Sequence, residues 1–307
     1  MKYILSLFML SLSLVSFSNP VTQVVVFGDS LSDAGNLYEY MNHQLPMSPP
    51  YYEGRFTNGP VWIEILMQKM FPNDYTEHLF NYAYGGANVA VNDQDNNFSL
   101  ENQLKRYFTQ FETANPDALY VIWVGANNYL DLPEDIPDTC NQVVNGIGNA
   151  LESLVQKGAK RFILVNIPDL STTPAAIEFD AVNDLKHMSE MHNAMLVGKV
   201  NQLKAKYPDV QWIEFDVADI MGDIITHPQA HGFKDGQHTC CEYMDNPIAQ
   251  TTNHKVLSVV NAMAYAPTKG NDLCYDYLFF DLYHPTAHAH QLMAEEVYKL
   301  VLDKKFM

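Results

Sequence analysis

The chain has 307 residues, of which 47% are hydrophobic, and its formal net charge is −18 at pH 7. This length allows one large domain with a sizeable core. So acidic a surface argues against binding nucleic acid and against docking on strongly anionic membranes, but it permits transient contact with a neutral or zwitterionic lipid surface.

The first eighteen residues have the pattern of a secretory signal peptide. Lys2 precedes an apolar, serine-rich stretch that ends in small residues, so cleavage is predicted after Ser18. Lys2 is the only charge lost, which leaves residues 19–307 with a formal charge of −19. Beyond this segment no run approaches the ~18 consecutive apolar residues of a spanning helix. The sequence predicts a soluble, secreted protein, with passage through the periplasm if the source is Gram-negative.

Short apolar runs alternate with longer helical patterns along the rest of the chain. The predicted strands are Gln23–Phe27, Leu79–Ala83, Leu119–Val124, Phe162–Ile167 and Gln211–Phe215. The helical patterns are Pro60–Phe71, the stripes Leu100–Phe111 and Val143–Leu154, Val182–Lys206 and Thr286–Lys304. This alternation is typical of a parallel sheet with crossover helices, so we predict a single α/β domain over residues 19–307.

Two regions break the alternation. Pro46–Asn58 is rich in Pro and Tyr and is predicted to lie over the carboxyl edge of the sheet. Met221–Leu273 reads as a long insertion after the fifth strand, with an apolar helical stripe over Val256–Met263. A loop of this length in a compact domain is usually functional or disordered.

The cysteines predict at least one disulfide, because an exported chain with an even number of them usually pairs them. They are Cys140, Cys240, Cys241 and Cys274. Neighbouring cysteines rarely bond each other, so we expect Cys274 to pair with Cys240 or Cys241, which would close an insertion around residues 240–274. Cys140 could take the remaining partner. A zinc site formed by His227, His231, His238 and the cysteine pair is a weaker alternative, because C-x-x-C spacing is absent.

The residues with the clearest chemistry stand near the two ends of the chain. FGDSLSDAGN (27–36) reads as a buried strand that turns sharply into a helix, which places Ser30 at the carboxyl edge of the sheet, where open α/β folds build their active sites. A serine nucleophile needs a base, and the base needs an orienting acid. Asp281 and His284 lie three residues apart in FDLYHP, so a single turn can present both. A serine hydrolase is the leading interpretation.

Five blocks, in order, resemble those of the GDSL family of esterases and lipases, within the SGNH hydrolase superfamily. They are FGDSLSDAGN, RFTNGPVWIEIL (55–66), NYAYGGAN (81–88), VGANNY (124–129) and DLYHP (281–285). The resemblance covers residues 27–285, nearly the whole predicted mature chain. One departure is Asn128, where the family usually has Asp, and it puts the local hydrogen bonding in doubt.

The resemblance implies a three-layer α/β/α, flavodoxin-like fold with a five-stranded parallel sheet in the order 2-1-3-4-5. It implies that Ser30 is the nucleophile, His284 the general base and then acid, and Asp281 the orienting acid. The N–H groups of Ser30 (at a helix N-terminus) and Gly86 and the side-chain amide of Asn127 would stabilise the oxyanion. No metal or cofactor is implied, and we interpret Asp29 as structural.

The resemblance is nearest to the secreted bacterial branch of phospholipases A, lysophospholipases and glycerophospholipid:cholesterol acyltransferases. It implies hydrolysis of lipid acyl esters, with a lysophospholipid or phospholipid substrate, and acyl transfer as a further option. A short-chain or carbohydrate acetyl esterase is the alternative, and a non-catalytic secreted binding module is a distant one. Candidate residues for an acyl groove are Tyr51, Tyr52, Phe56, Trp62 and the Leu104–Phe111 stripe. The insertion is predicted to regulate access to the cleft, and an activating protease could nick it.

Overall fold

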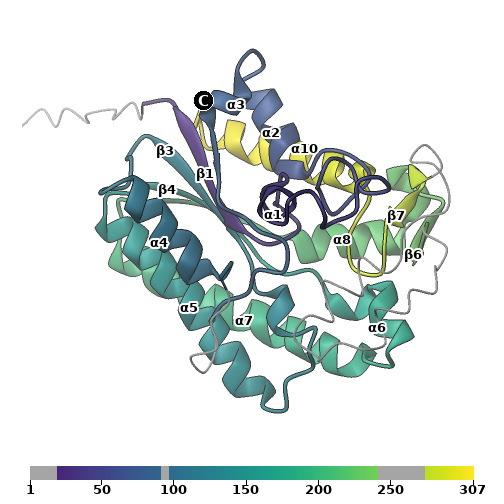
Figure 1. The fold of residues 1–307 in the computed structure, drawn as a ribbon. Coiled ribbons are helices and arrows are strands. Elements are labelled where there is room, and N and C mark those ends of the chain that lie inside the picture. Colours follow the sequence, from purple (N-terminus) through teal and green to yellow (C-terminus); the bar gives the residue numbers. More distant parts are fainter. Residues whose placement is uncertain (1–18, 91–96, 241–273) are drawn as a thin grey trace, which may run out of the picture.

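A computed structural model describes residues 19–90, 97–240 and 274–307, and its centre is a parallel sheet (Figure 1). The strands are β1 (Gln23–Gly28), β2 (Leu79–Asn81), β3 (Ala118–Trp123), β4 (Arg161–Val165) and β5 (Gln211–Phe215). They pair in the order β2-β1-β3-β4-β5, all parallel, with Val26 opposite Asn81 on one side and Val121 on the other. The predicted strand positions, order and direction are confirmed.

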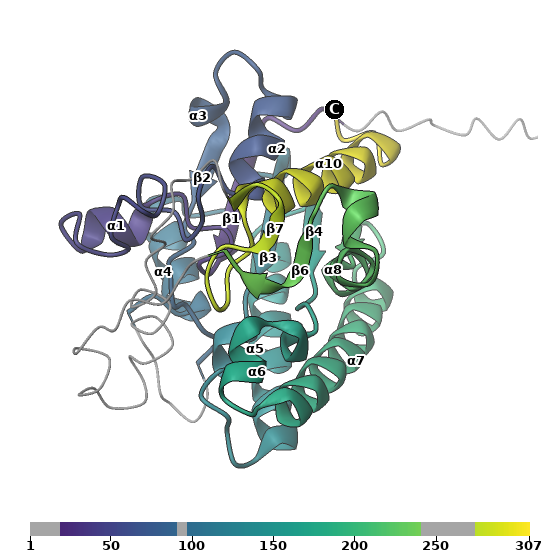
Figure 2. The ribbon, with the colours of Figure 1, turned by 90° about the vertical axis from the view of Figure 1, so that its right-hand side faces the viewer.

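Helices cover both faces of the sheet, which gives the predicted three layers (Figure 1). They are α1 (Asn36–Tyr40), α2 (Trp62–Met70), α3 (Tyr75–His78), α4 (Leu100–Gln110), α5 (Ile136–Gln156), α6 (Pro174–Glu178), α7 (Val182–Lys206), α8 (Val217–Thr226) and α10 (Ala287–Asp303). Helices α4, α5 and α7 pack on one face, and α2, α8 and α10 pack on the other (Figure 2).

The sequence of the central strands explains the two covered faces. Along β1, Val25 and Phe27 belong to the core cluster of α4, α5 and α7, whereas Val24 and Val26 belong to that of α2, α8 and α10. All four side chains are fully buried. Successive residues of a strand point to opposite faces, so an unbroken apolar run requires a layer of helices on each side.

Two local predictions about helices were wrong. No helix follows Ser30 directly: the chain makes a turn, and α1 begins only at Asn36. The Asp33 carboxylate accepts the N–H groups of Gly35 and Asn36, and Gly35 has φ +105°, so the chain cannot run straight into a helix. The long insertion predicted after β5 does not begin at Met221, because Met221 lies within helix α8.

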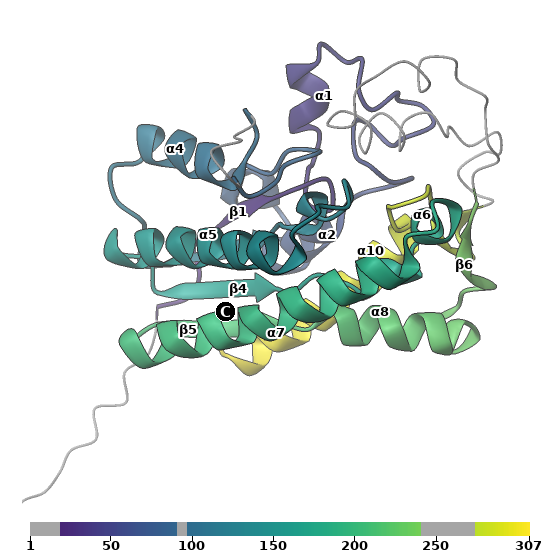
Figure 3. The ribbon, with the colours of Figure 1, turned by 90° about the horizontal axis from the view of Figure 1, so that it is seen from below.

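The chain beyond α8 adds a small second sheet. Strand β6 (Asp235–Thr239) pairs with β7 (Tyr277–Phe279), and both lie beyond the end towards which β4 points, together with α6 (Figure 3). The predicted stripe Val256–Met263 and Cys241 lie outside the described residues, as does the predicted signal peptide. Within the described ranges, no helix is long and apolar enough to cross a membrane.

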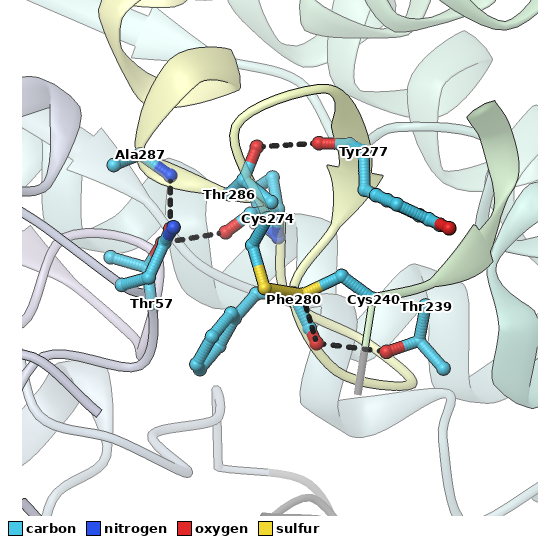
Figure 4. Close-up of a disulfide and its surroundings, with 10 residues drawn as sticks. Thr57, Thr239, Cys240, Cys274, Tyr277, Phe280, Thr286 and Ala287 are labelled. Atoms are coloured by element: carbon cyan, nitrogen blue, oxygen red, sulfur yellow. Dashed lines mark hydrogen bonds between the residues drawn. A yellow bond between two sulfur atoms is a disulfide. The ribbon is translucent and has the colours of Figure 1, made fainter. Parts of the chain in front are cut away.

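One disulfide joins Cys240, at the end of β6, to Cys274, just before β7 (Figure 4). This confirms one of the two predicted partners of Cys274. Cys140 is not bridged; its thiol is fully buried in α5, 3.9 Å from the Met188 carbonyl on α7. The expectation that Cys140 could take the remaining partner was therefore wrong, because this thiol belongs to the core between two helices.

Candidate active site

Ser30 stands two residues beyond the end of β1, and a buried glutamine fixes the strand end before it. Gln103 accepts the Gly28 N–H at 2.9 Å and donates to the Gly28 carbonyl at 2.8 Å. Gln103 lies on the buried face of α4, between Leu100 and Leu104. Gln103 was not among the predicted site residues, although a polar side chain on an apolar helix face was a usable signal, because such a group needs a buried partner.

The three predicted triad residues are brought together. His284 Nε2 lies 2.8 Å from Ser30 Oγ, and His284 Nδ1 lies 2.7 and 2.9 Å from the two oxygens of Asp281. Ser30 is 8% exposed, His284 7% and Asp281 fully buried. With its proton on Nδ1, the imidazole can accept the serine proton at Nε2, which is the arrangement that activates a serine.

The Asp281 carboxylate is held by the turn that carries it. Its Oδ1 accepts the backbone N–H groups of Tyr283 at 2.8 Å and of His284 at 2.7 Å. Its Oδ2 accepts the hydroxyl of Tyr51 at 2.7 Å. Two of these donors follow from the Asp-x-x-His spacing on one turn, whereas Tyr51 comes from the distant Pro46–Asn58 segment.

The predicted oxyanion donors line a hollow next to Ser30. Gly86 has φ +72°, a left-handed conformation that favours glycine. Asn127 donates one amide hydrogen to the Ala87 carbonyl at 2.7 Å, which leaves the other for a ligand. The lining residues are Ser30, Phe56, Gly86, Asn127, Leu130, Tyr283 and His284. The Ser30 N–H is at a turn rather than at a helix N-terminus, which corrects that part of the prediction.

The buried carboxylate of Asp33 connects the turn after β1 to the Gly85–Gly86 turn. Besides Gly35 and Asn36, it accepts the Gly85 N–H at 2.7 Å. A Cβ at Gly85 would lie 2.3 Å from the Phe56 ring, so the chain there must be bare backbone. The two glycine-containing loops beside Ser30 are therefore fixed to each other.

Asn128, the departure from the family pattern, makes a pair of hydrogen bonds of which an aspartate could make only one. Its Oδ1 accepts the Val89 N–H at 3.0 Å and its Nδ2 donates to the Val89 carbonyl at 2.8 Å. These two hydrogen bonds join the turn that contains Asn127 to the loop that contains Gly86. The local hydrogen bonding that the departure from the family pattern put in doubt is therefore satisfied by the asparagine.

Replacing Asn128 with Asp, the usual family residue, should lower the free energy of unfolding of the protein. The carboxylate would lose the donor to the Val89 carbonyl and would face that oxygen with like charge, so we expect a loss of about 1–3 kcal/mol in unfolding free energy. Denaturant unfolding measures this, with Asn128→Ala as the comparison. An Asp variant as stable as the wild type would contradict the paired contact.

Asp29 is a buried carboxyl next to the nucleophile. It is 2% exposed, and its Oδ1 accepts the Leu31 N–H at 3.0 Å. Burial raises its pKa to about 7, against the opposing effects of that N–H and of His284. Because the folded state holds this proton more tightly than the unfolded chain, Asp29 contributes stability at low pH that is lost as pH rises from about 4 through 7.

Asp29→Asn should therefore remove a pH-dependent loss of stability. We expect the Tm of the variant, relative to wild type, to rise by at least about 2 °C between pH 4.5 and pH 8, since the wild type loses the contribution of protonated Asp29 over that range. Thermal unfolding at four or five pH values measures the difference. A Tm difference that is constant with pH would show that Asp29 titrates normally.

Two other buried histidines do not compete with His284. His192 lies against Tyr129, whose hydroxyl is 2.8 Å from its Nδ1, and His290 accepts the Trp62 N–H at 3.2 Å. Burial lowers the pKa of His192 to about 4 and that of His290 to about 3, so both are neutral at pH 7. Neither is hydrogen-bonded to Ser30, so we assign both a structural role.

A mostly apolar cavity opens from Ser30 along the carboxyl edge towards β5. Its lining residues include Trp123, Leu130, Leu170, Val217, Met221, Phe279 and Met293, together with Asp29, Asp169, Thr172 and Thr173. Of the aromatic residues expected in an acyl groove, Phe56 reaches the smaller hollow, whereas Trp62 is core and Tyr51 contacts Asp281. The Leu104–Phe111 stripe packs in the core on the face of the sheet that α4, α5 and α7 cover.

The histidines of the alternative zinc site have carboxylate partners instead. His227 and His231 both contact Asp223, at 3.0 and 2.7 Å, and His238 contacts Asp235. Within the part of the chain that the structure describes, no group of three or more His, Cys, Asp or Glu residues is arranged to hold a metal ion.

The family model for GDSL-like Lipase/Acylhydrolase matches residues 24–297, and the chain belongs to this family. With its fold and its serine–histidine–aspartate geometry, it is a GDSL-type serine esterase. It is 33% identical to a phosphatidylcholine-sterol acyltransferase of Aeromonas hydrophila, over 89% of this chain and 88% of the relative.

Two further relatives are longer than this chain. The secreted effector protein SseJ of Salmonella typhimurium is 31% identical over 89% of this chain, which spans 62% of that protein. The thermolabile hemolysin of Vibrio parahaemolyticus is 25% identical over 90% of this chain, which spans 63% of it. The family matches the one indicated by the sequence blocks, including its bacterial branch.

Proposed function

We propose that the protein hydrolyses acyl esters of lipids, as a lysophospholipase A or phospholipase A, with Ser30, His284 and Asp281 as its catalytic residues. Residues 19–307 form the single catalytic domain in this proposal. The observation that carries it is the mostly apolar cavity that Ser30 helps to line. Such a cavity suits the acyl chain of a lipid ester, because the transfer of its apolar surface from water into an apolar cavity is favourable.

The geometry supports an acyl-enzyme mechanism. Ser30 Oγ attacks the carbonyl carbon of the ester while its proton passes to His284 Nε2. The negative charge on the carbonyl oxygen is stabilised by the N–H groups of Ser30 and Gly86 and by the Asn127 amide. His284 then gives the proton to the leaving alcohol oxygen. Water, activated by the same histidine, releases the fatty acid and restores Ser30.

Transfer to another alcohol uses the same acyl-enzyme. The relative from Aeromonas hydrophila is named as a sterol acyltransferase, so a sterol hydroxyl is the acceptor to test here. Which acceptor reacts depends on how far water is excluded from the cleft once the acyl chain is bound.

The test compares dipalmitoyl phosphatidylcholine, palmitoyl lysophosphatidylcholine and p-nitrophenyl acetate side by side, with and without cholesterol. We expect kcat/KM for the long-chain lysolipid to exceed that for the acetyl ester. Met221→Trp, which would fill the cavity, should reduce hydrolysis of palmitoyl esters and spare the acetyl ester. Activity confined to acetyl esters would instead support a short-chain or carbohydrate acetyl esterase.

We also propose that the protein is exported by the segment 1–18. The Cys240–Cys274 disulfide supports this, because such bonds persist mainly in oxidising compartments. N-terminal sequencing of the protein recovered outside the cytoplasm should begin at Asn19. An intact Met1 on the active, disulfide-bonded protein would contradict cleavage. Contact with a zwitterionic lipid surface, and activation by a protease, are further proposals; vesicle co-sedimentation and limited proteolysis test them.

A further inference from the structure

Tyr51 is buried directly beside the catalytic carboxylate. It is 2% exposed, and its hydroxyl donates to Asp281 Oδ2 at 2.7 Å. The same oxygen lies 2.7 Å from His284 Nδ1. The Tyr51 ring packs edge-on against Phe280 and Phe56, with ring centroids 5.2 and 6.2 Å apart. Packing therefore directs the hydroxyl at one carboxylate oxygen.

The segment that carries Tyr51 also touches the rest of the triad turn. We call residues 51–58 the strap. The Phe56 ring lies 5.1 Å from the His284 ring. Thr57 donates its hydroxyl to the Pro285 carbonyl at 2.8 Å, and Asn58 accepts the Ala287 N–H at 2.8 Å. Figure 4 shows Thr57 facing this turn, close to Ala287. The strap thus contacts the triad turn on both sides of His284.

We propose that Tyr51 is a positioning residue of the catalytic site, whose hydroxyl fixes the rotation of the Asp281 carboxylate and limits the negative charge that it presents to His284. This inference rests on the triad proposed above. The contacts of Asp281 supply the reason: Oδ1 is held by two backbone N–H groups, whereas among the described residues Tyr51 is the only donor apart from His284 on Oδ2.

Two consequences follow from removing the hydroxyl. The carboxylate loses a constraint on its orientation, so the imidazole is less well aligned with Ser30 and chemistry slows. The carboxylate also keeps more of its charge for the imidazolium, so the catalytic base is protonated more readily. The first effect lowers kcat, and the second moves the acid limb of the kcat/KM profile to higher pH.

The test is Tyr51→Phe, which keeps the ring and its packing on Phe280. With a soluble ester we expect kcat to fall about tenfold with KM within twofold, and the acid limb of kcat/KM to move to higher pH. In the Asp281→Asn background, the same substitution should change kcat less than twofold, because the charged acceptor is already gone.

Tyr120→Phe is the matched control. Tyr120 is also fully buried, and its hydroxyl bonds the hydroxyl of Tyr107 and the Asn115 carbonyl, away from the triad. Tyr120→Phe should lower Tm without moving the pH profile of kcat/KM. If Tyr51→Phe behaves like Tyr120→Phe while Ser30→Ala is inactive, the role of Tyr51 is refuted and the triad stands. If Ser30→Ala remains active, the triad itself is wrong and this inference falls with it.

Discussion

Replacing Ser30 with alanine should lower kcat for ester hydrolysis by about 10⁶-fold while leaving the fold intact. The hydroxyl lies 2.8 Å from His284 Nε2 and is the group that would form the acyl bond, and loss of a serine nucleophile in comparable triads has an effect of this size. The side chain is small and its side-chain hydrogen-bond partner is His284, so little packing is lost. Active-site titration with an organophosphorus reagent should label the wild type on Ser30 and leave the variant unlabelled.

Ser32→Ala is the control for this variant. Ser32 lies two residues along the same turn, fully buried, and its hydroxyl accepts the Trp62 indole N–H at 3.1 Å. Its removal leaves that donor unpaired, so Ser32→Ala should lower Tm more than Ser30→Ala and retain most of the activity. Substantial turnover by a folded Ser30→Ala protein would refute the nucleophile assignment.

The sheet and the triad could be predicted because their signals are local. Each central strand is buried on both faces, so it appears as a short apolar run whatever surrounds it. Asp281 and His284 share one turn, so their spacing alone brings their side chains together. Ser30 required one further step, that the ends of parallel strands meet at one edge.

The missed residues act across long separations. Tyr51 and Asp281 are 230 positions apart, and Gln103 and Gly28 are 75 apart. Nothing in an aromatic residue shows whether its hydroxyl contacts a carboxylate or its ring lines a groove, so Tyr51 was grouped with Trp62, which is core. An even number of cysteines likewise favoured a partner for Cys140, but burial in a helix interface explains a free thiol equally well.

Asn127→Ala should reduce kcat by about 10²–10³-fold with little change in KM, if its free amide hydrogen meets the oxyanion. The developing charge is larger in the transition state than in the bound ester, so the lost hydrogen bond acts mainly on the chemical step. The variant also leaves the Ala87 carbonyl without its amide donor, so a modest loss of Tm is expected and must be separated from catalysis.

Two binding measurements make that separation. The dissociation constant of a boronic acid inhibitor, whose tetrahedral adduct on Ser30 resembles the intermediate, should rise in parallel with the loss of kcat/KM in Asn127→Ala. The affinity for unreacted lysophospholipid, measured in Ser30→Ala with and without Asn127→Ala, should not change. Equal weakening of both ligands would mean that Asn127 binds substrate uniformly, or that the loop has moved, and would remove it from the oxyanion hole. If only the binding of the boronic acid adduct is weakened, Asn127 belongs to the oxyanion hole. The N–H groups of Gly86 and Ser30 are then the donors that remain in the variant, because a side-chain substitution does not remove backbone amides.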